Sequence, residues 1–190
     1  MRRIHQHASA LIAVATLTFS TIANATVFNI NRSIGNGGSV VGSVSTDGTL
    51  GQLATSNITA WTLKLSEGGD TFDLIAGNSE VLVTSAGLSA TATELWFNFS
   101  ASGYVLFQNS PLNSGNPFWC LQGPNNCATT FSGESVRASA PLTPFESSPY
   151  SGLQLIATVA PIPEPSTFAL YLLGVTGMVL GSRQLARANS

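Results

Sequence analysis

Short runs in which apolar and polar side chains alternate fill the chain from Val27 to Val159. The segment 61–66 alternates in this way, and the segment 95–100 repeats the pattern. A period of two places successive side chains on opposite faces of a β-strand, whereas a helix repeats every 3.6 residues. Clusters of Gly, Asn, Ser and Pro separate the runs, as turns between strands require. The pattern therefore predicts short strands with one buried and one solvated face.

Further strands of this kind are expected at 39–46, 71–76, 80–84, 88–93, 104–108 and 153–159. So many short strands with frequent turns are typical of a single antiparallel β-sandwich or jelly-roll-like domain. We expect Asp47-Gly48 and Gly68-Gly69 to join neighbouring strands, because glycine adopts the positive φ values of tight hairpins. Alternation fades between Gly133 and Pro149, where prolines remove backbone donors, and this segment is predicted to be a long surface loop.

The first 25 residues have the three parts of a secretory signal peptide: a basic start, an apolar stretch, and small residues at Ala23 and Ala25. We expect cleavage after Ala25 by general secretion, because Arg2-Arg3 lacks the longer motif that follows in the twin-arginine route. A transmembrane anchor is the alternative, but the apolar run is brief and diluted by Thr and Ser. The chain then divides into a signal peptide 1–25, a β-domain 26–160 and a C-terminal segment 161–190.

The C-terminal segment begins with three prolines between Pro161 and Pro165, which cannot continue a sheet. A charge-free apolar run at 166–182 follows, and then Arg183 and Arg187. As a helix this run spans about 26 Å, slightly less than a hydrocarbon core of about 30 Å. We therefore expect a marginal transmembrane helix. The positive-inside rule keeps the two arginines cytoplasmic and the β-domain on the far side of the inner membrane.

The order of these C-terminal features resembles the PEP-CTERM sorting signal, in which Pro163-Glu164-Pro165 precedes an apolar helix and an arginine-containing tail. The resemblance covers only the segment 161–190. It implies that exosortase, a membrane enzyme similar to cysteine proteases, recognises Pro163, Glu164 and Pro165 and cuts near them. It also implies delivery to the envelope, surface or exopolysaccharide matrix of a Gram-negative bacterium. The segment from Trp119 to Cys127 resembles domains often attached to this signal and implies no activity.

Two cysteines, Cys120 and Cys127, enclose a turn-rich segment of six residues. An exported protein meets an oxidising environment, so we expect a local disulfide between them. Closing so short a loop stabilises the fold by about 2 kcal/mol in the chain-entropy account. A metal site, the alternative, needs another Cys or His nearby, and the sequence places none there.

Charge and histidine content exclude several classes of function. Between Thr26 and Ile162 three cationic side chains face eight carboxylates, a net charge of −5, so a nucleic-acid partner is excluded. The only histidines, His5 and His7, lie in the segment expected to be removed. Catalytic triads that use histidine and histidine-ligated metals are therefore excluded from the mature domain.

The remaining candidates for chemistry are carboxylates and aromatic rings. Glu67, Asp70 and Asp73 surround a glycine turn and are candidate Ca²⁺ ligands or catalytic carboxylates, the alternative being a solvated hairpin. No other cofactor is expected. Four aromatic residues are candidate sugar-binding platforms: Trp96 beside Glu94, Tyr104, Trp119 and Tyr150. The alternative is that they are part of the core. The expected core aromatics are Trp61, Phe97, Phe99 and Phe107.

Together these features favour an exported, noncatalytic structural or polysaccharide-associated module of the cell surface or extracellular matrix. The expected partners are exosortase, exopolysaccharide and, transiently, the inner membrane. Two alternatives stay open: an enzyme that acts on polysaccharide with carboxylates alone, and an adhesin that binds other proteins.

Overall fold

The computed structural model describes residues 25–84, 86–124, 127–139 and 145–159. The predicted signal peptide up to residue 24, with Ala23, lies outside these residues, and so does the sorting segment with Pro163-Glu164-Pro165. Within the described residues no helix is both long and apolar enough to cross a membrane. The predicted apolar helix at 166–182 is not among them.

The described chain forms two antiparallel β-sheets. The larger sheet has the strand order β3-β7-β8-β13-β1-β2-β4-β5. Its strands are β1 (Thr26–Ile34), β2 (Gly38–Thr46), β3 (Gly51–Gln52), β4 (Ile58–Glu67), β5 (Asp70–Ile75), β7 (Leu88–Ala90), β8 (Glu94–Asn98) and β13 (Leu153–Val159), and a 3-10 turn, η1 (Thr55–Asn57), precedes β4. The smaller sheet has the order β12-β11-β10-β9-β6. Its strands are β6 (Ser79–Val83), β9 (Tyr104–Asn109), β10 (Phe118–Gln122), β11 (Gly133–Arg137) and β12 (Glu146–Pro149).

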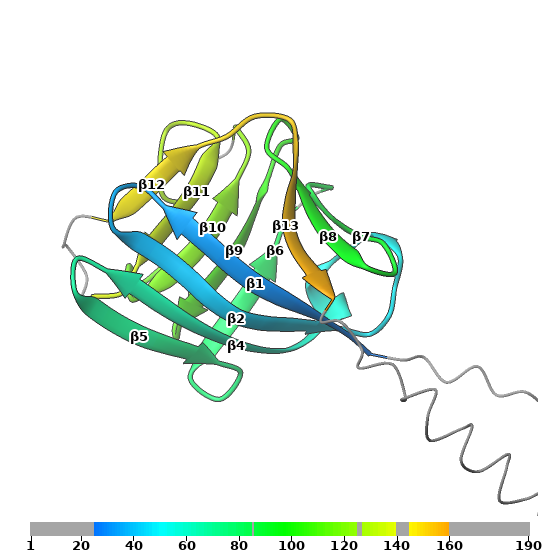
Figure 1. Ribbon diagram of the computed structural model, residues 1–190, viewed down its shortest axis with the longest axis horizontal. Helices are drawn as coiled ribbons and strands as arrows, with labels where there is room; N and C mark the ends of the chain where they lie inside the picture. Colours follow the sequence, from blue (N-terminus) through cyan, green and yellow to red (C-terminus); the bar gives the residue numbers. More distant parts are fainter. Residues whose placement is uncertain (1–24, 85, 125–126, 140–144, 160–190) are drawn as a thin grey trace, which may run out of the picture.

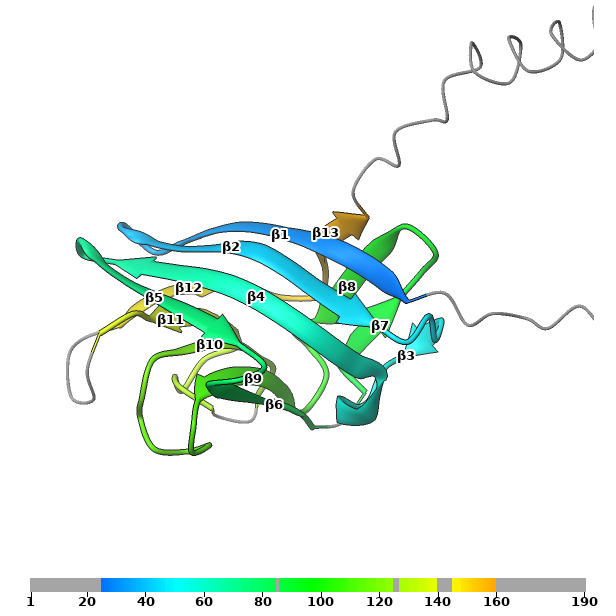
Figure 2. The same ribbon diagram turned by 90° about the horizontal axis from the view of Figure 1, so that it is seen from below.

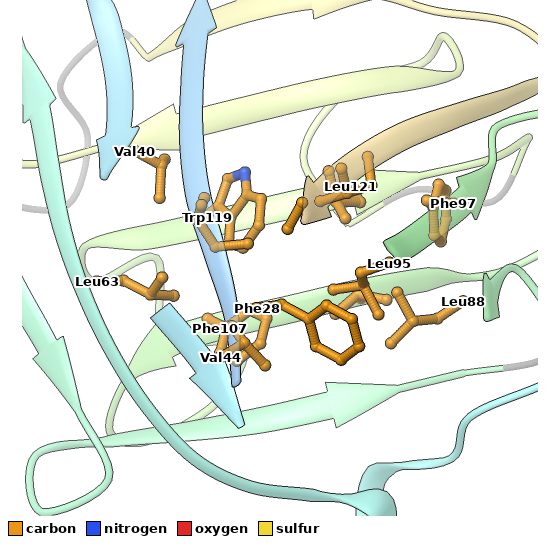
Figure 3. Packing of buried hydrophobic residues seen from close by; sticks show 14 of the residues in the cluster. Phe28, Val40, Val44, Leu63, Leu88, Leu95, Phe97, Phe107, Trp119 and Leu121 are labelled. Atoms are coloured by element: carbon orange, nitrogen blue, oxygen red, sulfur yellow. The ribbon is translucent and has the colours of Figure 1, made fainter. Parts of the chain in front are cut away.

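The two sheets lie in layers, with β1, β2, β4 and β13 on one side of the core and β6, β9, β10 and β11 on the other (Figures 1 and 2). One hydrophobic cluster fills the space between them. Figure 3 shows Phe28 and Leu63 of the larger sheet packed toward Phe107, Trp119 and Leu121 of the smaller one. Each such side chain contributes roughly 1.5–3 kcal/mol on burial, so the layers are held mainly by apolar packing. The prediction of an all-β antiparallel fold is confirmed.

Alternation explains the strands that the sequence predicts well. In β8, Leu95 and Phe97 are buried while Trp96 and Asn98 are partly exposed. Phe97, Phe99 and Phe107 are buried in the core, as predicted. Trp61 is partly buried against the same cluster, and its indole N–H donates to the Ser79 hydroxyl at 2.9 Å.

One of the two predicted hairpin turns is confirmed and the other is wrong. Gly68 and Gly69 have φ values of +56° and +101° and connect β4 directly to β5. The residues after Asp47 instead form β3 and η1 before β4 begins. The Asp47 carboxylate accepts hydrogen bonds from the Asn57 side chain at 3.0 Å and from the Thr49 amide at 2.9 Å. These bonds, that of Asn57 above all, lower the pKa of Asp47 and fold the segment back on itself.

The predicted surface loop from Gly133 to Pro149 is also wrong, because it contains two strands. Strand β11 pairs with β10 on one side and with β12 on the other. Its residues from Gly133 to Val136 are all buried. Since neither face of β11 is solvated, apolar and polar residues do not alternate along it, and the sequence pattern gives no strand signal.

Gly42 is in β2, which lies between β1 and β4 in the larger sheet. A substitution there tests how tightly these strands pack. Gly42 has a φ of +150°, and a Cβ there would overlap the Thr62 carbonyl oxygen. We expect Gly42→Ala to lower the free energy of unfolding by about 1–3 kcal/mol, as measured by denaturant unfolding of the purified protein. The matched control is Gly37→Ala, where no atom lies within 4 Å of the new Cβ, and its effect should stay within about 0.5 kcal/mol. Equal midpoints for the two variants would contradict this packing.

Candidate functional site

A buried ion pair crosses the interior from one sheet to the other. Arg32 of β1 donates through Nη2 and Nε to the Glu134 carboxylate of β11, at 2.8 and 3.0 Å. The indole N–H of Trp119 donates to the other carboxylate oxygen at 2.8 Å. The Glu134 side chain is fully buried, and the Arg32 side chain keeps 17 % of its surface exposed. Three charged or polar donors therefore satisfy one buried carboxylate, as a charge in an apolar core requires.

Arg32 also connects this ion pair to the outer part of the larger sheet. Its Nη1 donates to the Leu155 carbonyl of β13 at 3.1 Å, and its guanidinium lies 5.4 Å from the ring centre of Tyr150. Burial by itself would lower the pKa of Arg32, but the hydrogen bonds and the charge of Glu134 outweigh it and raise that pKa. The guanidinium therefore stays charged, and that charge is neutralised from within the core.

A groove opens on the outer face where β1 and β13 separate. The ladder between these strands runs from the pair Phe28–Val159 to the pair Ile30–Ala157, and there it ends. On its other side β13 shifts register against β8 between Leu155 and Ala157, which makes Ile156 the extra residue of a β-bulge. The groove has a volume of about 220 Å³ and is lined by residues of both strands, namely Asn29, Asn31, Arg32, Leu155, Ile156, Ala157 and Thr158.

Trp96 lies beside this groove. It is directly opposite Leu155 in the β8–β13 ladder, so both side chains are on the outward face. The Trp96 indole N–H donates to the Glu94 carboxylate at 3.2 Å, which fixes the direction of the ring along β8. In the next row, Glu94 faces Thr158, and Thr158 faces Asn29. Two exposed asparagines, a hydroxyl and the exposed Leu155 thus line the depression, and the half-buried indole of Trp96 is on the neighbouring strand opposite Leu155.

This arrangement suits a ligand that is rich in hydroxyl groups and carries no negative charge. Apolar faces of sugar rings pack on an indole, and side-chain amides bind sugar hydroxyls. The Arg32 charge at the floor is already neutralised by Glu134, and Glu94 repels anions at the rim. Among the described residues that line the groove, none is a carboxylate, so the groove itself supplies no acid–base pair.

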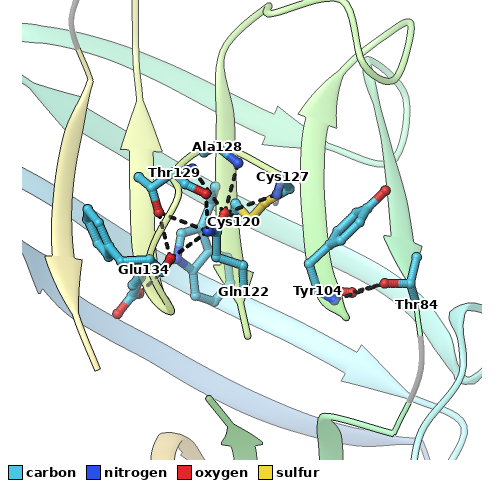
Figure 4. The surroundings of a disulfide bond; sticks show 10 residues. Thr84, Tyr104, Cys120, Gln122, Cys127, Ala128, Thr129 and Glu134 are labelled. Carbon is cyan, nitrogen blue, oxygen red and sulfur yellow. Dashed lines mark hydrogen bonds between the residues drawn. A yellow bond between two sulfur atoms is a disulfide. The ribbon is translucent and has the colours of Figure 1, made fainter. Parts of the chain in front are cut away.

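The predicted disulfide between Cys120 and Cys127 is confirmed, with 6.7 Å between the two Cα atoms. A second anchor, which the sequence analysis missed, holds the same loop (Figure 4). The fully buried Gln122 accepts backbone N–H bonds from Cys127, Ala128 and Thr129 at 3.0, 2.8 and 3.2 Å. Its amide nitrogen donates to the carbonyl of Phe131 at 2.6 Å. A lone glutamine at the end of an otherwise apolar strand is the signal that could have indicated this role.

The three candidate carboxylates do not converge. Glu67 is buried and accepts a hydrogen bond from the Ala138 amide at 2.9 Å, so it fastens β4 to the end of β11. Asp70 is exposed across the hairpin from Glu67, and Asp73 is opposite Lys64 on the other face of the sheet. In the part of the chain that the structure describes, no group of three His, Cys, Asp or Glu side chains is arranged to hold a metal ion.

The four candidate aromatic platforms have different surroundings. Trp119 is 1 % exposed and stacks on Phe107 with ring centres 5.5 Å apart, so it belongs to the core. Tyr150 packs against Phe99 at 5.2 Å and against Arg32. Tyr104 contacts a second apolar cluster on the outside of the smaller sheet. Trp96 is the candidate that flanks a groove.

Comparison with known proteins found no match to this chain among family models, curated proteins or solved structures.

The ion pair generates a stability prediction. Glu134→Gln keeps the shape of the side chain but leaves the Arg32 guanidinium without its counter-charge. We expect the free energy of unfolding to fall by about 3 kcal/mol, the lower end of the range for a broken buried pair, because Arg32 is 17 % exposed. The control is Glu80→Gln on β6, an exposed glutamate, which should change it by less than about 0.5 kcal/mol. Urea unfolding measures both, and an equally small effect of the two changes would refute the role of the pair.

Proposed function

We propose that this protein is an exported, noncatalytic module of the bacterial surface or extracellular matrix that binds polysaccharide through the groove between β1 and β13. The observation that carries the proposal is the indole of Trp96, fixed by Glu94, beside a groove lined with the amides of Asn29 and Asn31. An aromatic face next to hydroxyl-binding amides is the combination that sugar recognition needs.

Export and sorting belong to the same proposal. They are supported by the signal-peptide pattern at 1–25 and by the PEP-CTERM-like segment at 161–190, which make exosortase the proposed processing enzyme. The disulfide also supports them, because such bonds persist in oxidising compartments. Phe28 pairs with Val159, so the start of β1 and the end of β13 lie side by side (Figure 1). A jelly-roll-like sandwich attached at one end fits temporary retention at the inner membrane.

The noncatalytic part of the proposal is supported by the placement of the carboxylates. Glycosidases that use carboxylates need two of them facing one bond, about 5–10 Å apart. Glu67 is occupied by the Ala138 amide, and Asp73 is on the opposite face of the larger sheet from Glu67. This separation favours a binding module over an enzyme.

Binding at the groove is tested by Trp96→Ala. The change removes the aromatic face, and we expect the affinity for the exopolysaccharide of the native host to fall about tenfold, measured by affinity electrophoresis. Phe131→Ala is the control, since Phe131 is an aromatic residue, 40 % exposed, in the link between β10 and β11 of the smaller sheet. Unchanged binding by the Trp96 variant, or hydrolysis of the polysaccharide by the wild type, would sink the proposal. Binding to partner proteins and to no glycan would favour an adhesin.

Sorting is tested by replacing Pro163, Glu164 and Pro165 with alanine in the native host. We expect an uncut precursor that stays with the membrane fraction, visible on an immunoblot as a larger band. Pro161→Ala, a change in the same segment but outside the motif, should be processed normally. Release of the triple variant in the wild-type amount would show that the motif does not direct processing.

A further inference from the structure

The two cysteines of the disulfide have different surroundings. Cys120 is in the middle of β10 and is completely buried, with 0 % of its surface exposed. Cys127 is in the link between β10 and β11 and is partly exposed. Their side chains meet on the outer face of the smaller sheet, in the apolar cluster that contains Leu106 and Phe118 (Figure 4). A reagent that comes from solvent therefore meets Cys127 before Cys120.

Cys127 also lines a half-open pocket on this outer face. The pocket has a volume of about 310 Å³, within the range of roughly 300–1,000 Å³ that is usual for sites of small molecules. Leu106, Phe118 and Ala128 line it as well, whereas Cys120 is not among the described residues of its lining. A pocket of this size admits a small molecule but not a folded protein. It gives such a molecule access to one of the two cysteines.

Cys120 has a polar neighbour that lacks a hydrogen bond. Ser135 of β11 is directly opposite Cys120 in the ladder, so both side chains are on the same face of the sheet. Ser135 is 0 % exposed, and within the described residues its hydroxyl has no hydrogen-bond partner. A buried hydroxyl without a partner is unfavourable, and a sulfur with a negative charge is an acceptor for it. The Ser135 hydroxyl can therefore donate to Cys120 Sγ when the disulfide opens.

The loop after β10 does not depend on the disulfide alone. Gln122 accepts the backbone N–H groups of Cys127, Ala128 and Thr129, and it donates to the Thr129 carbonyl at 2.7 Å. None of these bonds involves a sulfur atom, so they persist when the bond between the sulfurs breaks. Cys120 Sγ is 3.8 Å from Gln122 Oε1, within reach of an S–H donor. The opened form therefore keeps Cys127 beside Cys120, ready to close again.

We infer that Cys127 is a site of reversible S-thiolation, at which a low-molecular-weight thiol enters the pocket and opens the disulfide. The thiolate of the reagent attacks Cys127 Sγ and forms a new disulfide there, and the electron pair of the broken bond goes to Cys120 Sγ. Ser135 donates to this sulfur until it takes up the proton that the reagent lost. In the reverse step Cys120 Sγ attacks Cys127 Sγ, and the small thiol leaves and regains its proton. One disulfide and one thiol stand on each side of the reaction, so no other oxidant or reductant is needed.

This site does not depend on the groove beside Trp96, because the two are on the outer faces of different sheets. It also gives the exported protein a chemistry that needs no histidine. In an oxidising compartment the closed disulfide prevails, and the adduct forms only where a small thiol is supplied.

The test is peptide mapping by mass spectrometry of the intact chain in detergent micelles, after incubation with 2-mercaptoethanol and its disulfide and an acid quench. The sequence has only two cysteines, so an adduct must be on one of them. In the native protein we expect at least about tenfold more adduct on Cys127 than on Cys120, because access controls which sulfur is attacked. In urea the pocket is lost and the preference should disappear. The inference is overturned if the native protein acquires no adduct, or if the adduct is on Cys120 or equally on both.

Single variants measure the same preference without the competing closure. Cys127 in the Cys120→Ser variant should react with the reagent's disulfide at least about tenfold faster than Cys120 does in the Cys127→Ser variant. Equal rates in these two variants would also overturn the inference.

A change of the pocket wall tests the route of entry. Ala128→Leu narrows the pocket and should slow formation of the adduct about tenfold, because exchange rates depend on access. Ala60→Leu, at an exposed position of β4, is the matched control and should leave the rate unchanged. An Ala128 variant that reacts as fast as the wild type would contradict entry through this pocket. The mapping of the wild-type protein decides the matter even where a variant does not fold.

Discussion

Apolar packing between the two sheets is non-directional, and the pair of Arg32 and Glu134 adds a directional contact across it. It joins β1 to β11, fixes the Trp119 ring in the core, and reaches the Leu155 carbonyl on β13. An apolar pair of the same volume could give a similar stability, since buried ion pairs often add little net stability. Such a pair would not donate a hydrogen bond to the Leu155 carbonyl as Arg32 does. The position of the surface groove therefore depends on an interaction inside the core.

Alternation predicts strands best where one face of the sheet is solvated. Segment 61–66 lies within β4 of the larger sheet, and 95–98 forms most of β8. Strand β9 is an exception, because it was predicted although Val105 to Gln108 are all buried. Strands β10 and β11 were not predicted, since the residues of β10 from Phe118 to Gln122 are all buried, as are most of those of β11. Loops of the smaller sheet cover its outer face, and no single window of sequence reveals which loop covers which strand. The disulfide could be predicted because only six residues separate the two cysteines in the sequence.

Separation along the chain also explains which contacts between site residues the sequence could predict. Glu94 and Trp96 are two residues apart on one strand, so their contact follows from alternation. Glu67, Asp70 and Asp73 are also close in sequence, yet an odd spacing on one strand places Asp70 and Asp73 on opposite faces. Arg32 and Glu134 are 102 residues apart, and only the packing of the two sheets brings them together. Spacing in sequence can therefore predict pairs on one strand but not a site shared by two sheets.

Net charge is a poor guide to what this protein attracts. The region from Thr26 to Ile162 carries a net charge of −5, which by itself would repel an acidic polymer. Each of its three cations has a different place: Arg32 is neutralised in the core, Lys64 faces Asp73 on the larger sheet, and Arg137 lines a pocket among aromatic rings. A Debye length of about 8 Å at physiological salt screens distant carboxylates, whereas a cation in contact with its ligand is screened far less. The total charge therefore says little about the surroundings of each cation.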